Sequence, residues 1–363
     1  MERHFINVKR CLAAVASLML LAVPNAKAYT YTALDGSGAQ YGTAGYWALV
    51  DGKASSKSIV EFPGRKLDYF VIFKSDKAVV PSNYFLILGD DTGDLPHRNW
   101  KSWQIYGANF ASDAEATRNA SGWVLLDDKK NAGLPAINRG SVDLVCSEKT
   151  TKSYQYFMIN VSEVEAIEDL MQMAEFGWGS SEEFLAGTPL EFFVLRGSNL
   201  KGSQNGSGTC MFDGNYSTKY CSAFYPGTPQ YVVVRTNRSL APTSYTLVTG
   251  DDTADYPERN WRDWQVFGGN FASDGDAVRD AEGWVLLDER TEYLDLPAKN
   301  LTEVKFDFNK GVSEKYQYFK IEINKCMTDR LQDMQMAEFL LNEEFIPVYT
   351  SNVELPTEGG TNV

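Results

Sequence analysis

The residues best suited to chemistry are arginines and tryptophans in a short segment that the chain contains twice. Residues 98–113 read RNWKSWQIYGANFASD and residues 259–274 read RNWRDWQVFGGNFASD, so that 11 of 16 letters are identical. Guanidinium groups form paired hydrogen bonds with carboxylates and other oxygens, and indole faces pack against the apolar C–H groups of a sugar ring. A segment of this kind that occurs twice indicates recognition rather than a single catalytic centre.

We predict that Arg98, Trp100, Arg259 and Trp261 contact a ligand. For the arginines, the alternative is an ion-pair clasp with aspartates of the same loop, which reads GDDTGD in the first copy and GDDTAD in the second. For the tryptophans, the alternative is a cap on the hydrophobic core. Four further tryptophans recur at matched positions and are expected in that core, namely Trp103, Trp123, Trp264 and Trp284.

Catalytic residues do not recur between the two copies. His97 is replaced by Glu258, and the sequence contains no G-x-S-x-G, no Gly-rich phosphate loop and no H-E-x-x-H. Without C-x-x-C, and with one histidine after residue 28, a Cys–His zinc site is excluded. Cys210 and Cys221 flank one turn, and their spacing leaves a disulfide between them open. A glycosidase carboxylate pair stays open as a minor alternative. We predict that the protein is not an enzyme.

The duplication extends over most of the chain and defines its organisation. GDDTGDLPHRNW (89–100) matches GDDTADYPERNW (250–261), and MQMAEF occurs at 171–176 and again at 334–339. Each unit is about 150 residues long, which is a normal size for one globular domain and too long for a solenoid repeat. We therefore predict two tandem homologous domains.

Short apolar, β-branched and aromatic runs, such as YFVIF and YVVVR, are separated by turns rich in Gly, Pro, Asp and Asn. This pattern is typical of an all-β sandwich or jelly roll. The segment 166–176 lacks clean alternation, so a helix is the alternative there. The predicted division is a signal peptide at 1–28, domains at 29–180 and 181–345, and a polar tail at 346–363.

The first 28 residues have the features of a signal peptide. Three of the first ten residues are Lys or Arg, the apolar run CLAAVASLMLLAV follows, and Asn-Ala-Lys-Ala ends the segment. This pattern predicts cleavage after Ala28, and the apolar run is too short to cross a bilayer. Removal of the segment changes the net charge from −14 to about −17. We expect an exported chain that inserts into no membrane, binds no nucleic acid and suits a neutral ligand or a bound cation.

Five motifs in the same order in both copies resemble the coagulation factor 5/8 type C domain, also called the discoidin domain, of the galactose-binding-like fold. They are an Asp-Gly turn followed by S/T-K, R-N-x-x-x-W, W-x-L-L-D, Y-x-Y-F and a closing A-E-F. The chain is also similar to family 32 carbohydrate-binding modules of secreted Bacteroidetes proteins. The resemblance implies an eight-stranded jelly roll with ligand-binding loops at one end. Members bind galactosides and other glycans, phospholipid headgroups or proteins, and most are not catalytic.

The resemblance also implies one structural calcium ion per domain, where the Asp-Gly turn meets the late Ala-Glu pair. Carboxylate, hydroxyl and carbonyl oxygens would be its ligands. In the first copy, Lys53 adds a positive charge to the turn, so we expect the second copy to bind calcium better; the alternative is a turn held by hydrogen bonds alone. The implied ligands are Cys210, Asp213, Asn215, Thr218, Ala337 and Glu338 in the second copy, and Asp51, Ser56, Ala174 and Glu175 in the first.

We therefore predict a secreted or surface-associated, non-catalytic carbohydrate-binding protein that recognises a glycan or glycoconjugate through end loops of two discoidin-like domains. Two weak sites on one chain gain avidity for a repetitive ligand. The alternative is a protein-binding adhesin or surface-assembly component that uses the same loops on a host or envelope protein.

Overall fold

The computed structural model describes residues 29–37, 39–40, 45–61, 67–166, 170–200, 206–225, 227–328 and 332–343. Within these residues the regular structure is almost entirely β, with short 3-10 turns and the six-residue helix α1 (Ser181–Ala186). No helix in this part of the chain has the length and apolar character needed to cross a membrane. The predicted signal peptide and C-terminal tail lie outside the described residues.

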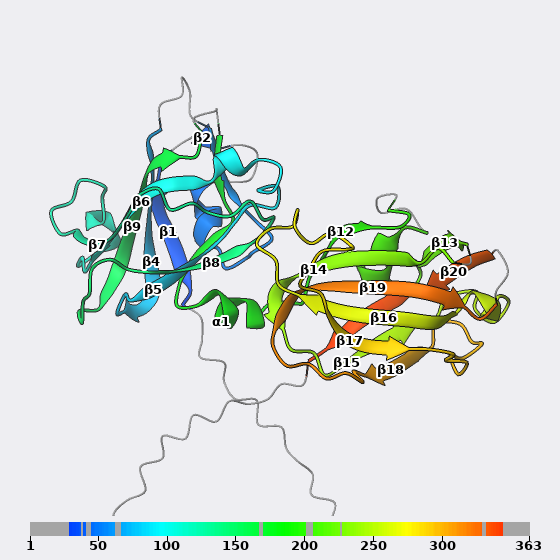
Figure 1. The fold of residues 1–363 in the computed structure, drawn as a ribbon. Helices are drawn as coiled ribbons and strands as arrows, with labels where there is room; N and C mark the ends of the chain where they lie inside the picture. Colours follow the sequence, from blue (N-terminus) through cyan, green and yellow to red (C-terminus); the bar gives the residue numbers. More distant parts are fainter. Residues whose placement is uncertain are drawn as a thin grey trace, which may run out of the picture.

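The first domain is a β-sandwich (Figure 1). One layer is a five-stranded sheet in the order β1-β4-β9-β6-β7, and the other contains the three-stranded sheets β10-β3-β2 and β11-β5-β8. Buried side chains from both layers form one hydrophobic core. The strands are β1 (Tyr31–Gly36), β2 (Ala39–Gln40), β3 (Ser58–Glu61), β4 (Tyr69–Val79), β5 (Asn83–Ile87), β6 (Trp100–Ala108), β7 (Val124–Lys129), β8 (Ser141–Val145), β9 (Tyr154–Val164), β10 (Leu170–Met173) and β11 (Glu175–Trp178).

The second domain repeats this arrangement. Its five-stranded sheet has the order β12-β14-β19-β16-β17, and the sheets β13-β20 and β18-β15-β21 form the opposite layer. The strands are β12 (Phe192–Gly197), β13 (Tyr220–Phe224), β14 (Gln230–Leu240), β15 (Ser244–Val248), β16 (Trp261–Gly269), β17 (Val285–Arg290), β18 (Glu303–Asp307), β19 (Tyr316–Cys326), β20 (Gln332–Met336) and β21 (Glu338–Asn342).

The predicted all-β class with two tandem β-sandwiches is therefore confirmed. The alternative of a helix over 166–176 is wrong for the described part of that segment, because β10 and β11 occupy it and pair with β3 and β5. The predicted boundary between residues 180 and 181 lies between β11 and α1. The domain limits themselves stay predictions.

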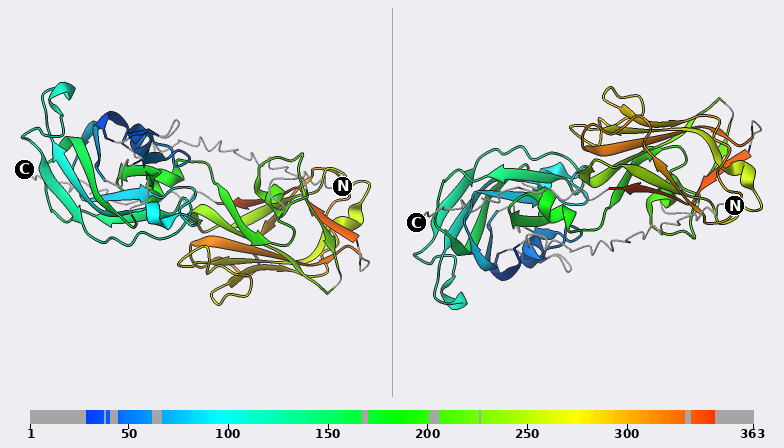
Figure 2. Two further views of the ribbon diagram at one scale, coloured as in Figure 1. Left: turned by 90° about the horizontal axis from the view of Figure 1, so that it is seen from above. Right: turned by 90° about the horizontal axis from the view of Figure 1, so that it is seen from below.

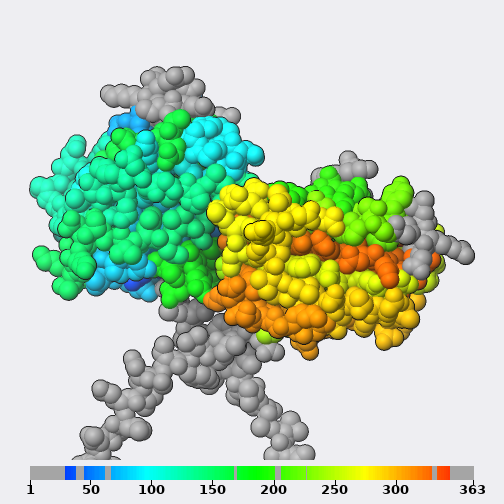
Figure 3. Space-filling model, in the orientation of Figure 1, coloured from blue at the N-terminus to red at the C-terminus, as the bar shows by residue number. Residues whose placement is uncertain are grey.

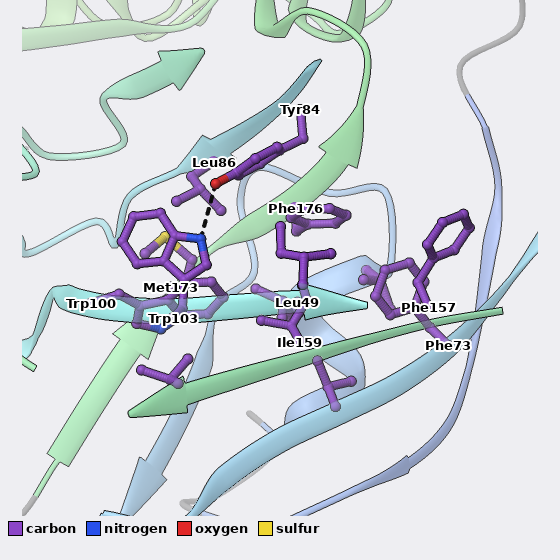
Figure 4. Packing of buried hydrophobic residues seen from close by; sticks show 14 of the residues in the cluster. Leu49, Phe73, Tyr84, Leu86, Trp100, Trp103, Phe157, Ile159, Met173 and Phe176 are labelled. Carbon is purple, nitrogen blue, oxygen red and sulfur yellow. Dashed lines mark hydrogen bonds between the residues drawn. The ribbon is translucent and has the colours of Figure 1, made fainter. Parts of the chain in front are cut away.

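Trp103 of β6 and Trp264 of β16 belong to the core, and their N–H groups are hydrogen-bonded. Trp103 Nε1 donates to the Tyr84 hydroxyl at 3.0 Å (Figure 4). This hydroxyl donates to a buried carboxylate oxygen of Asp127 at 2.6 Å. A buried polar group costs free energy unless it is hydrogen-bonded, so this chain of donors allows a carboxylate inside the sandwich. The second domain contains the same chain, made of Trp264, Tyr245 and Asp288.

The two sandwiches lie side by side (Figures 2 and 3). Arginine side chains make contacts between them. Arg235 of β14 is fully buried and donates to the backbone carbonyl of Asn138 in the first domain. Arg139 of the first domain forms an ion pair with Glu191 at 3.0 Å. The ring of Phe193 lies against both guanidinium groups, with centroid distances of 4.4 Å to Arg235 and 5.8 Å to Arg139. Such planar groups at a domain contact favour one relative orientation.

Candidate functional site

The loops that lead into β6 and β16 hold the two predicted arginines in ion-pair clusters. Each loop contains one 3-10 turn, η3 (Pro96–Arg98) or η6 (Pro257–Arg259). In the first loop, Lys57 Nζ lies 2.6 Å from Asp90 and 2.8 Å from Asp91, and Arg98 lies 3.6 Å from Asp91. Burial alone would raise the pKa of Asp91, but Lys57 and Arg98 lower it overall. Arg98 is thus engaged within its own loop, as the clasp alternative proposes.

The second loop has the same cluster. Lys219 lies 2.8 Å from Asp251 and also pairs with Asp252, and Arg259 lies 3.4 Å from Asp252. Arg259 also approaches Asp333 at 3.9 Å, and its side chain keeps about one fifth of its surface exposed. A guanidinium that is paired yet partly exposed can still donate to a ligand hydroxyl.

The prediction that Trp100 and Trp261 stack on a ligand is wrong, because both indoles are 0% exposed. Trp100 packs on Trp103 with ring centroids 5.7 Å apart, and Trp261 packs on Trp264 at 6.1 Å. Residues three apart in a regular strand point to opposite faces. The pairing with β9 and β19 shifts register between the two tryptophans, and such a bulge turns both side chains of each pair into the core.

Tyr256 is a candidate binding residue that comparison of the two copies did not reveal. It precedes η6, its side chain is 42% exposed, and Arg259 Cζ lies 3.8 Å from its ring centroid. Its counterpart in the first copy is Leu95, so a search for residues common to both copies misses it. The sequence does mark this position in another way, because an aromatic residue is present in only one of two otherwise similar loops.

The second predicted calcium site brings its two carboxylates to one place. Asp213 follows the 3-10 turn η5 (Gly208–Phe212) and accepts hydrogen bonds from the Thr218 hydroxyl and the Asn215 N–H, both at 2.8 Å. Glu338, the first residue of β21, is 0% exposed, and neither of its carboxylate oxygens makes a hydrogen bond of good geometry among the described residues, although the backbone N–H groups of Gly214 and Asn215 lie close enough to lower its pKa in part. Burial, and then the Asp213 carboxylate, raise the pKa of Glu338 to about 8.

This arrangement fits a hard divalent cation. Buried carboxylate oxygens without donors are costly, and a cation between Glu338 and Asp213 would remove that cost. Of the other implied ligands, Cys210 lies in η5 and Ala337 immediately precedes Glu338. No disulfide joins Cys210 to Cys221 in the structure. In the structure, the turn between Cys210 and Cys221 is therefore held by hydrogen bonds such as those that Asp213 accepts, and a bound ion would add to them.

The first predicted calcium site is closed by hydrogen bonds. Asp51 follows the 3-10 turn η1 (Tyr46–Val50) and accepts from the Ser56 hydroxyl at 2.8 Å. The backbone N–H of Lys53 donates both to Asp51 at 3.0 Å and to Glu175 at 2.9 Å. The N–H of Phe176 donates to the second oxygen of Glu175 at 3.1 Å. Burial, and then Asp51, still raise the pKa of Glu175 well above its usual value. Ala174 precedes Glu175 in the chain, as Ala337 precedes its counterpart.

Each acid pair supplies only two charged ligands. In the described part of the chain, no three His, Cys, Asp or Glu side chains gather in a way that could hold a metal ion. Any cation would therefore need hydroxyl and carbonyl oxygens as its remaining ligands. Calcium accepts such mixed oxygen shells, whereas structural zinc sites use cysteine and histidine.

No protein-family model matches the chain, and no curated protein matches its sequence. Several solved structures are similar to it at low scores. Allantoicase from Saccharomyces cerevisiae is 13% identical with a TM-score of 0.33, over 86% of this chain and 89% of that one. The CBM32-1 and CBM32-2 domains of Clostridium perfringens ZmpB are 9% identical with a TM-score of 0.31, over 87% and 93%. The family 32 module of C. perfringens NanJ, solved with galactose, is 12% identical with a TM-score of 0.29, over 42% and 97%. Scores at this level assign neither a family nor a function.

Proposed function

We propose that this chain is an exported, non-catalytic glycan-binding protein of the discoidin type, and that its second domain binds sugar through the loop that contains Tyr256 and Arg259. The observation that carries the proposal is the half-exposed Tyr256 ring, which contacts the Arg259 guanidinium. The Cζ atom of Arg259 lies 3.8 Å from the centroid of this ring. The five motifs that resemble the discoidin domain support the same class.

The chemistry of this loop suits a saccharide. The free face of Tyr256 can pack against the C–H groups of a pyranose ring. The partly exposed Arg259 can donate to hydroxyl groups, and Asp333, about half of whose side chain is exposed, can accept from them. In the first domain Leu95 replaces the tyrosine, so the proposal assigns the weaker site to that domain.

The absence of catalysis is part of the proposal. Asp251 and Asp252 of the Tyr256 loop form ion pairs with Lys219, and Asp252 also pairs with Arg259, so their carboxylate oxygens are already engaged. Burial alone would lower the pKa of Lys219, but the paired aspartates raise it overall. A lysine held charged in this way is a poor nucleophile or general base.

We also propose that Asp213, Thr218, Glu338 and neighbouring carbonyl groups hold one calcium ion, which would stabilise the contact between the η5 turn and β21. The support for this ion is the fully buried Glu338 carboxylate beside Asp213, whose oxygens make no hydrogen bond of good geometry among the described residues. The Lys53 N–H takes up oxygens of the corresponding pair in the first domain, so that domain would bind calcium less well.

A glycan array probed with the full-length chain tests the function. Tyr256→Ala should weaken binding about tenfold, since loss of an aromatic contact is worth on the order of 1 kcal/mol. The matched control is Leu95→Ala at the equivalent position of the first domain, which should have a smaller effect. If no glycan binds while a host or envelope protein is captured, the glycan proposal is wrong and the adhesin alternative holds.

A further inference from the structure

A cavity of about 410 Å³ lies where the second domain meets the first. Its apolar walls include the aromatic rings of Phe192, Phe193 and Phe212, and Arg139 reaches it from the first domain. Pockets of roughly this size, apolar with a few polar groups, are typical of sites for small ligands. The two-domain arrangement thus creates a cavity to which both domains contribute.

The equivalent cavity in the first domain is closed. It has a volume of about 20 Å³ and lies beside Glu175, the counterpart of Glu338. Phe184 of α1 fills it and packs against Phe85 of β5, with ring centroids 4.9 Å apart. The residue that corresponds to Phe85 in the second domain is Thr246. The larger cavity is therefore not a general property of this sandwich.

The charged residues that line the cavity of the second domain form two groups, a pair of acids and an ion pair. At one position, the fully buried carboxylate of Glu338 lies in the wall of the cavity, and Asp213 lies beside it. At another, Arg139 and Glu191 form a 3.0 Å ion pair across the domain contact, so that their charges cancel. In the absence of a cation at Asp213 and Glu338, the net charge of the lining is therefore negative, which disfavours an anionic ligand.

The backbone fixes the position of Arg139. Its φ of 50° lies in the left-handed region, and its N–H donates to the Gly89 carbonyl at 2.9 Å. The corresponding residue of the second domain, Leu301, has φ 48° and the same type of hydrogen bond to Gly250, and it is 42% exposed. The loop thus projects this side chain outward in both domains, and only the first domain places an arginine against its neighbour.

We propose that this junction cavity is a second sugar site that holds one hexose unit without an anionic group. The aromatic walls would take the C–H face of the ring, and Arg139 and Glu191, whose side chains are partly exposed, would exchange hydrogen bonds with its hydroxyl groups. The inference rests on the proposed glycan-binding function and assigns that function a site built from both domains.

The test is calorimetric titration of the full-length chain with galactose, glucose and mannose, and with galacturonic acid as the anionic probe, in buffer with chelator. The variants are Arg139→Ser for the junction, its matched control Leu301→Ser, and Tyr256→Ala for the loop site. Circular dichroism and gel filtration of each variant check that the fold and the monomer size are unchanged.

We expect a neutral hexose to bind the Tyr256→Ala variant at one site per chain, and Arg139→Ser in that background to weaken the binding at least tenfold. Leu301→Ser should change nothing, and galacturonic acid should not bind there. If Tyr256→Ala abolishes all binding, the junction site is refuted while the loop proposal stands. If Arg139→Ser alone abolishes all binding, the junction stands and the loop proposal is refuted. If the unmodified chain binds no sugar on an array or in solution, both are refuted.

Discussion

Replacement of Glu338 by glutamine should stabilise the chain in the absence of calcium and remove its response to calcium. The reason lies in the pKa of Glu338, which burial and Asp213 raise from an ordinary 4.5 to about 8. A folded-state pKa above the unfolded value contributes stability at pH values below 4.5. This contribution is lost as the pH rises through about 8. A glutamine has the shape of the protonated acid and takes no part in this titration.

The magnitude follows from the linkage between proton binding and folding. At pH 7.5 the folded chain must keep a proton that the unfolded chain releases, which costs at most about 4 kcal/mol relative to low pH. For a domain of this size, this corresponds to a change of roughly 10 °C in melting temperature. Calcium at 100 times its Kd would add about 2.7 kcal/mol of stability to the unmodified chain.

Scanning calorimetry of the full-length chain at pH 5 and pH 7.5, with calcium and with chelator, measures these effects. The matched control is Glu175→Gln. Burial and Asp51 raise the pKa of Glu175 as well, so this change should likewise stabilise the chain at pH 7.5, but it should leave the response of the second domain to calcium unchanged. Two results together would show that the cation site does not exist. The unmodified chain would have the same melting temperature with calcium and with chelator, and the Glu338→Gln variant would have that same melting temperature at pH 5 and at pH 7.5.

Three further changes test the packing around the site. Trp261→Ala should destabilise the chain by about 3–5 kcal/mol in urea denaturation, because the indole is fully buried, and Trp261→Phe should recover part of this loss. Tyr245→Phe should cost about 1–3 kcal/mol in the same assay, since the buried Asp288 carboxylate loses a donor. Arg235→Met removes the donor to the Asn138 carbonyl, so limited proteolysis should cut between the domains faster than in the unmodified chain, while equal cleavage rates would show that the contact does not hold the domains together.

The fold could be predicted because its determinants are local and occur twice. Apolar and aromatic runs separated by turn residues define strands, and matched segments such as MQMAEF show that the strand order repeats. The segment 166–176 was ambiguous because β10 and β11 are buried on both faces, which removes the alternation that distinguishes a strand from a helix.

The site was predicted only in part. The Arg–Asp clusters follow from residues within one loop, and the clasp alternative identified them. The orientation of Trp100 and Trp261 depends on a register shift against β9 and β19, which lie far away in the sequence. The position of Arg139 at the junction depends on how two separate domains pack, and no local pattern records that.

The differences between the copies therefore carry more information about binding than the identities. At three positions around the acid pair and the ligand loop, the second domain has the residue that leaves more room or offers more chemistry: Asn215 for Lys53, Tyr256 for Leu95 and Thr246 for Phe85. Identical residues such as the core tryptophans Trp103 and Trp264 are buried in both domains and maintain the packing of each sandwich. One copy has a closed cavity and contributes Arg139 to the cavity of the other. Under the proposed function, this asymmetry predicts a division of labour, with the first domain as support and the second as the binding domain.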